Sequence, residues 1–203
     1  MRVLAIDCAT EACSVALFEG GTLRDARHTE LGRGHAERLV PMIAELPQHG
    51  RADEIRVGLG PGSFTGTRIA LAAARALGIA WNAQVLGMPT LALVAASRTA
   101  GGREATVCMA GGHGEWLVQN FDSRQMPQDT VRSLPPEQAA RAARHLDIIG
   151  NRAAELADIV GDAARQVHDA LPDARNAMLV DRSLLTSSLS PIYGRPPDAK
   201  LPA

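Results

Sequence analysis

The sequence predicts an α/β fold built from two similar halves, each a mixed sheet flanked by helices. The first half has the order strand, strand, strand, helix, strand, helix, strand, helix, and the second half repeats it in reduced form. Gly101 and Gly102 interrupt the pattern between the halves. We therefore expect an N-terminal lobe over residues 1–100 and a smaller C-terminal lobe with an extended tail over residues 103–203.

Three apolar runs open the first half and predict its first three strands. They cover residues 3–6, 13–18 and 22–28. Gly20 and Gly21 separate the second run from the third, and two glycines at such a place are typical of a tight hairpin turn. The first half therefore begins with an antiparallel ribbon.

Helices and short buried strands alternate through the rest of the first half. Apolar residues recur at helical spacing through residues 36–43, where Pro41 should kink the helix or mark its late start. The remaining elements are expected as strands at residues 55–59 and 84–86 and as helices at residues 65–80 and 90–97.

The second half begins with expected strands at residues 105–109 and 115–121. An alanine-rich helix at residues 136–145, a brief strand at 147–150 and helical segments to about Ser187 should follow. Residues 191–203 contain four prolines, so we expect an extended tail that docks on the surface through Tyr193 and Arg195.

Composition and charge favour an ordinary globular protein. Of the 203 residues, 46% are hydrophobic and 21% are charged, with a net charge of −1 and Lys200 as the only lysine. Such a chain lacks the clustered positive charge that autonomous RNA binding needs. Asp7 and Glu11 interrupt the N-terminal apolar run, which predicts neither a signal peptide nor a membrane span and favours the cytoplasm.

The cysteines and histidines predict no metal site. Cys8, Cys13 and Cys108 form no CxxC pair, so we expect reduced cytosolic thiols. A helix grips a metal through two histidines four residues apart, but residue 39, four after His35, is a leucine, and the other histidines are not so spaced. His35 is interpreted as a hydrogen-bonding residue at a helix terminus.

The segment GLGPGSFTGTR, residues 58–68, joins a predicted buried strand to a predicted helix. Its glycines allow close backbone approach, and Ser63 or Thr65 can cap the helix. Amide groups at a helix N-terminus attract anions, which favours a phosphate loop. The segment lacks both the GK[ST] of a P-loop and the GxGxxG spacing. A purely structural turn and a functional loop both stay open on these grounds.

The same segment, continued as LGPGSFTGTRIALAAARALG, resembles the signature of the TsaB (YeaZ) family, usually written GPGSFTGLRIG, with Thr67 and Ala70 as departures. RVLAIDCATEACSVAL at the N-terminus, HAERLVPMI and the tail PIYGRPPDAK extend the resemblance. It implies a duplicated fold of the actin-like, Hsp70-like (RNase H-like) class, with the second lobe reduced.

The resemblance also implies a remnant nucleotide site between the lobes. The superfamily places a carboxylate like Asp7 where it faces the phosphates of a nucleotide, whereas a lone aspartate at a strand end more simply caps a turn. The residues of this remnant site would be Asp7, Gly60, Gly62, Ser63, Thr65 and Gly66. In the second half, residues 110–114 (AGGHG) and Glu115 depart from the family's Asp-Ala-Arg run, which argues against nucleotide binding.

The helix after the glycine loop is the expected partner interface. In the resembled family this helix lies between subunits, and here it is apolar on more than one side. The interface residues would be Arg68, Ile69, Ala70, Ala73, Ala74 and Leu77. On this interpretation Ala74→Glu or Ala70→Arg abolishes association with a partner and leaves the fold intact.

The function implied by the resemblance is that of a noncatalytic subunit. It would bind a TsaD-type catalytic subunit and, with a TsaE-type ATPase, ATP and Mg²⁺, support threonylcarbamoyl transfer to adenosine 37 of tRNAs that read codons beginning with A. No catalytic residues and no cofactor are expected in the isolated chain, tRNA would be contacted only through the complex, and a homodimer of the isolated chain stays open. The alternative is an active ATPase or small-molecule kinase that uses Asp7 and residues 60–66; a peptidase has no supporting residue set.

Overall fold

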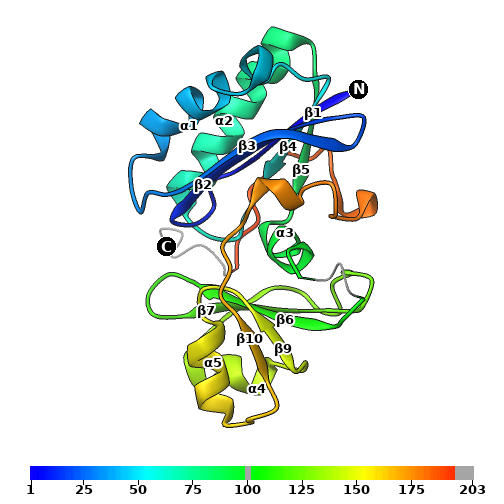
Figure 1. Cartoon of the computed structure of the whole chain (residues 1–203). Coiled ribbons are helices and arrows are strands. Elements are labelled where there is room, and N and C mark those ends of the chain that lie inside the picture. The colour runs from blue at the N-terminus through cyan, green and yellow to red at the C-terminus, as the bar shows by residue number, and fades with distance from the viewer. Residues whose placement is uncertain (99–101, 195–203) are drawn as a thin grey trace, which may run out of the picture.

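The computed structural model describes residues 1–98 and 102–194, which form two sheets stacked with helices between and around them (Figure 1). Each sheet has five strands, and the strand order is the same in both. The α/β prediction with duplicated, actin-like lobes is therefore confirmed. The expected boundary at Gly101 falls outside the described residues, so the exact division of the chain stays a prediction.

The first lobe contains the sheet β3-β2-β1-β4-β5. The first three strands pair antiparallel, and β4 and β5 join β1 in parallel. The glycines of the β2–β3 turn, Gly20 and Gly21, both have positive φ, as a tight hairpin requires. The elements are β1 (Arg2–Asp7), β2 (Ala12–Glu19), β3 (Thr22–Glu30), α1 (His35–Ala44), a 3₁₀ turn (Pro47–Gly50), β4 (Glu54–Gly58), α2 (Phe64–Trp81), β5 (Gln84–Met88) and α3 (Thr90–Ala96).

The second lobe contains the sheet β10-β9-β6-β7-β8. The β6–β7–β8 ribbon is antiparallel, and β9 and β10 extend it in parallel, as β4 and β5 do in the first lobe. The elements are β6 (Ala105–Ala110), β7 (Trp116–Phe121), β8 (Arg132–Leu134), α4 (Pro136–Ala142), β9 (Asp147–Ile149), α5 (Ala153–Val160) and β10 (Gln166–His168), followed by 3₁₀ turns at Ala174–Asn176 and Arg182–Leu184.

The apolar core forms three layers, of which the middle one joins the two lobes. Helices α1 and α2 cover the outer face of the first sheet, and α4 and α5 cover the outer face of the second (Figure 1). Helix α3 lies between the sheets, and every one of its residues is buried. Strands β1 and β2 are consequently covered on both faces, which explains why their sequences are nearly continuous apolar runs.

The chain after α5 differs from the expectation. The expected helical segments to about Ser187 are confirmed only in α5 and in the two short 3₁₀ turns: α5 ends before Gly161, which has φ +71°, and β10 follows as an edge strand that was not expected. The segment then crosses back to the first lobe, where Ala174, Ala177 and Val180 join the core between the sheets. Strands β8 and β10, three residues each, are too short to show an alternating pattern.

A buried ion pair fixes this returning segment to β4. Glu54 and Arg56 are almost fully buried, and the Arg56 Nε donates to the Glu54 Oε1 over 2.8 Å. The Arg56 Nη1 also donates to the backbone oxygen of Ala177 over 2.9 Å. Because an unpaired buried charge is costly, these contacts hold the 3₁₀ turn at Ala174–Asn176 against the first sheet.

The tail returns along the glycine loop and α2. The Ile192 amide donates to the Leu59 oxygen (2.8 Å), and the Ser133 amide donates to the Gly194 oxygen (3.2 Å), so the tail contacts both lobes. The expected docking of Tyr193 is confirmed, because its hydroxyl accepts a hydrogen bond from the Arg68 Nη2 (2.7 Å). Arg195 lies outside the described residues.

Candidate functional site: the hollow between the lobes and the face of α2

Asp7 stands at the end of β1 with its carboxylate enclosed by the first lobe. It is 1% exposed; its Oδ1 accepts from the Ala9 amide and its Oδ2 from the Thr90 hydroxyl, each over 2.8 Å. The Thr90 Oγ1 in turn accepts from the Gly60 amide (3.1 Å). Burial raises the pKa of Asp7 to about 6, against the smaller lowering by these hydrogen bonds and by His35. Asp7 thus ties the β1–β2 turn to α3 and the glycine loop, as the turn-capping interpretation requires.

The glycine loop presses against the β1–β2 turn, and this contact explains its composition. A Cβ on Gly62 would lie 1.9 Å from the backbone oxygen of Ala9, and one on Gly66 would lie 1.9 Å from that of Cys8. The Ser63 amide donates to the same Ala9 oxygen over 2.6 Å. Only glycine permits backbones to approach this closely, so the loop has at least a structural role.

Ser63 caps α2, as predicted. Its Oγ accepts from the Gly66 amide over 3.1 Å, which satisfies one of the free N–H groups at the helix start. Thr65, the alternative cap, lies one residue inside the helix. The other end of α2 closes with Asn82 in the left-handed conformation at φ +53°.

A hollow of about 300 Å³, which we call the central hollow, lies where the two lobes meet. Its lining residues come from the β1–β2 turn, the β3–α1 connection, the glycine loop, and the end of β6 with the turn after it: Ala9, Thr10, Glu11, Gly32, Gly62, Ser63, Ala110, Gly111 and Gly112. Across it, the Asn151 Nδ2 donates to the Glu11 Oε1 (2.7 Å), and the Asn151 Oδ1 accepts from the Ala110 amide (2.8 Å). Asn151 therefore links the lobes beside the hollow.

The hollow contains only part of the predicted nucleotide site. Gly62 and Ser63 line it, whereas Asp7, Gly60, Thr65 and Gly66 are not among the lining residues. Sequence reasoning missed Thr10, Glu11 and Asn151 as site residues, because their place beside the hollow depends on how the two lobes meet; the second-lobe wall at residues 110–112 lies in the segment that the resemblance had related to the nucleotide site. Among the described lining residues one carboxylate and no basic side chain is present, an arrangement that disfavours a polyphosphate.

Metal ligands do not gather elsewhere in the described ranges, 1–98 and 102–194: they contain no group of three or more His, Cys, Asp or Glu side chains arranged to hold an ion. His35 opens α1 and is 7% exposed, and its Nε2 has no hydrogen-bond partner among the described residues.

Within the same ranges, no helix is long and apolar enough to cross a bilayer.

The predicted partner interface on α2 needs a correction. Ala70 and Ala74 are fully buried in the core between α2 and the first sheet, so they cannot meet a partner without unfolding the helix from its own lobe. Ile69, Ala73 and Leu77 are half-buried against that core, and Arg68 is exposed. The buried face of α2 consists of Gly66, Thr67, Ala70, Leu71, Ala74 and Gly78.

The opposite side of α2, which we call the α2 outer face, carries exposed apolar residues. Phe64 at its start is 64% exposed and Ile79 near its end is 86% exposed. Between them lie Arg68, Ala72, Arg75 and Ala76, all exposed. The Arg68 guanidinium stacks 3.2 Å above the Phe64 ring and bonds the Tyr193 hydroxyl, which orders an aromatic cluster at the start of this face.

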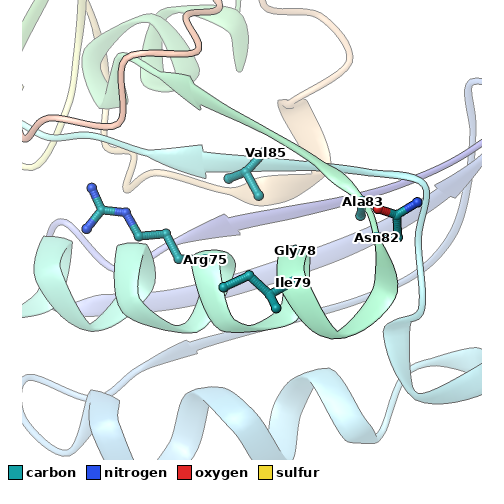
Figure 2. Close-up of a pocket in the computed structure, with 6 residues that line it drawn as sticks. All are labelled: Arg75, Gly78, Ile79, Asn82, Ala83 and Val85. Carbon is teal, nitrogen blue, oxygen red and sulfur yellow. The ribbon is translucent and has the colours of Figure 1, made fainter.

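A second hollow, of about 560 Å³, lies at the other end of the α2 outer face. It is lined by Arg75, Gly78, Ile79, Asn82, Ala83 and Val85. Figure 2 shows Arg75 and Ile79 projecting from the helix and Val85 on the neighbouring strand β5. The Arg75 Nη2 donates to the Leu189 oxygen over 2.8 Å, so the C-terminal segment borders this end of the face as well.

Comparison with known proteins identifies relatives of this arrangement. Residues 26–180, which include parts of both lobes, match the family model described as tRNA N6-adenosine threonylcarbamoyltransferase. The structure of YeaZ from Pseudomonas aeruginosa superposes with a TM-score of 0.77 and 26% identity, covering 95% of this chain and 99% of that one.

Two curated relatives carry the name tRNA threonylcarbamoyladenosine biosynthesis protein TsaB. The Escherichia coli protein is 43% identical over 101 residues (47% of this chain), and the Haemophilus influenzae protein is 37% identical over 106 residues (49% of this chain). Each alignment spans 43% of the relative, so the chain matches a little under half of their length. With the whole-chain match to YeaZ and the duplicated fold, these findings confirm the resemblance: the chain belongs to the TsaB (YeaZ) family.

Proposed function

We propose that this chain is a noncatalytic subunit of tRNA threonylcarbamoyladenosine biosynthesis. It binds a TsaD-type catalytic subunit and, together with a TsaE-type ATPase, supports threonylcarbamoyl transfer to adenosine 37 of tRNAs reading codons that begin with A. ATP and Mg²⁺ act in the complex, and tRNA is reached through the complex. The names of the relatives and the threonylcarbamoyltransferase family model support the pathway.

The observation that carries the partner role is the α2 outer face. Phe64 and Ile79 are large apolar side chains that the fold leaves open, and Ala72 and Ala76 between them are small enough for a helix to approach closely. The hollow at Arg75 and Ile79 beside this face suits an inserted side chain of a partner. A contact centred here keeps the helical interface proposed from the sequence but moves it to the opposite side of α2.

The supporting role itself is tested by reconstitution with TsaD-type and TsaE-type subunits. We expect threonylcarbamoyl incorporation into tRNA when all three proteins and ATP are present, a fall to background when this chain is omitted, and no incorporation by this chain alone. ATP turnover by the isolated chain that Asp7→Asn abolishes would instead favour the kinase or ATPase alternative.

The contact surface is tested by Ile79→Glu. Because the side chain is 86% exposed, the fold should be unaffected, whereas a carboxylate within the apolar contact should weaken association with the TsaD-type subunit at least tenfold. Leu146→Glu is the matched control, because Leu146 is an exposed leucine of the second lobe. Titration calorimetry with equal affinities for the two variants would place the contact elsewhere.

A further inference from the structure

Two thiols face each other beneath the β1–β2 turn. The Sγ atoms of Cys8 and Cys13 are 3.6 Å apart, and both residues are fully buried. The antiparallel ladder pairs Asp7 with Ser14, so the next position in the same register sets Cys8 opposite Cys13. Residues directly opposite on one face of a strand pair have neighbouring Cβ atoms, and the two sulfurs meet for this reason.

We propose that Cys8 and Cys13 form a reversible redox pair, which a hydroperoxide converts into an intramolecular disulfide. The inference is independent of the proposed partner role, because it concerns the chemistry of the two sulfurs and the loop they support.

The contact between the sulfurs lets one thiol donate to the other and so favours one thiolate in the pair. It lowers the pKa of Cys13 and, more than burial does, raises that of Cys8, and the steps with Cys13 as the attacking sulfur are as follows; the exchanged order gives the same disulfide. The Cys13 thiolate attacks hydrogen peroxide; the O–O bond breaks, Cys13 sulfenic acid forms, and the other oxygen leaves as hydroxide, which takes up a proton to become water (an organic hydroperoxide would release its alcohol instead). The Cys8 sulfur then attacks the sulfenic sulfur, the S–O bond breaks, and a second water leaves as the S–S bond forms. A dithiol such as dithiothreitol reverses the reaction by exchange.

Forming the bond draws the two sulfurs together beneath a turn whose backbone is tightly packed. A disulfide is about 2.05 Å long, so the sulfurs have to approach by roughly 1.5 Å from their present 3.6 Å. The oxygens of Cys8 and Ala9 already press on Gly66 and Gly62, and the Ala9 oxygen accepts from the Ser63 amide. Residues 8 and 9 therefore cannot shift alone. We expect oxidation to displace the glycine loop and the start of α2 as well.

The chain provides its own control in Cys108. This thiol is also fully buried, and burial raises its pKa to about 12, but it lies on β6 of the second lobe. Differences in solvent exposure therefore cannot explain a difference in reactivity between Cys108 and the Cys8–Cys13 pair. The sulfur–sulfur contact is a feature of the pair that Cys108 is not recorded to share.

The experiment exposes the folded, reduced chain to hydrogen peroxide and counts thiols after denaturation. We expect two of the three thiols to be lost at least tenfold faster than the third, the peptide that contains both Cys8 and Cys13 to become 2 Da lighter, and dithiothreitol to restore three thiols. Hydrogen exchange should rise in residues 58–66 on oxidation and return on reduction.

Three single variants test the assignment. Cys108→Ser should leave the crosslink and its rate unchanged, whereas Cys8→Ser and Cys13→Ser should each abolish it. If Cys8→Ser fails to fold, the wild-type chain with isotopic thiol labelling still reports each cysteine separately. Three intact thiols after a dose that fully oxidises a free thiol peptide in the same tube, or equal loss at all three positions, would overturn the proposal.

Discussion

The two lobes share one strand order but use it differently. Helix α2 of the first lobe has 18 residues and its counterpart α5 has 8, and β4 and β5 have five residues each where β9 and β10 have three. In the first lobe, β1 ends at buried Asp7 under a close-packed glycine loop, whereas β6 ends at Ala110 beside an open glycine turn. The second lobe thus keeps the strand order with shorter elements. The buried carboxylate and the close-packed glycine loop are found in the first lobe.

The largest expected effect tests the buried side of α2. Ala74→Glu should destabilise the fold by about 3–5 kcal/mol, because an unpaired carboxylate enters the core between α2 and the first sheet. Ala76→Glu, two residues away on the exposed side, should change the free energy of unfolding by about 0.5 kcal/mol or less. Urea denaturation measures both. Equal stabilities of the two variants would mean that α2 does not bury the face that contains Ala74.

How far the sequence predicts this helix shows where pattern reading fails. Its start at the Ser63 cap and its length were predictable from capping and periodicity. Its buried side was not, because an alanine-rich helix is apolar in several directions and hydrophobicity alone does not choose between them. A usable signal was present: Gly66, Ala70, Ala74 and Gly78 recur every four residues, and a Cβ on Gly78 would lie 2.5 Å from the Val85 side chain. Small residues in that row mark the face closest to the sheet.

The same contrast applies to the candidate site. Gly62 and Ser63 were predictable because turn and cap chemistry need those residue types. The remaining wall of the central hollow includes residues 110–112 of the other lobe, which only the family resemblance related to this site, because no local pattern shows that a turn a hundred residues away closes the same space. The hydrogen bond of Asn151 to Glu11 was unpredictable for the same reason, since it depends on how the lobes meet.

A smaller effect is expected where the two lobes use glycine for different reasons. Gly66→Ala should destabilise the chain by about 1–3 kcal/mol, because the added Cβ meets the backbone oxygen of Cys8, which cannot rotate away. Gly112→Ala in the second-lobe turn meets no atom within 4 Å and should be neutral or slightly stabilising. Thermal unfolding of the pair measures the difference. A neutral Gly66→Ala would show that the glycine loop has slack, which would also weaken the coupling proposed for the thiol pair.

The smallest expected effect is the pH dependence of the free energy of unfolding that Asp7 causes. The second lobe has no such group at the corresponding place, because β6 ends at Ala110. The pKa of Asp7 is about 6 in the folded chain and 3.8 as the ordinary value, chiefly because burial disfavours the carboxylate. The folded state therefore holds the proton more tightly than the unfolded state. The contribution of Asp7 protonation to the free energy of unfolding is fully present below pH 3.8 and is lost as the pH rises through 6. About 1 kcal/mol of it disappears between pH 5 and pH 7.5.

Asp7→Asn should remove this slope, since the amide keeps the size of the carboxyl group and does not titrate. Its carbonyl can still accept from the Ala9 amide, and its NH₂ can donate to the Thr90 Oγ1. The measurement is the free energy of unfolding in urea at several pH values between 5 and 7.5, compared between wild type and variant, so that every other titrating group cancels. The variant should gain relative stability as the pH rises. A difference between variant and wild type that stays constant across this range would mean that Asp7 is ionised in the fold throughout, and that burial does not set its protonation state.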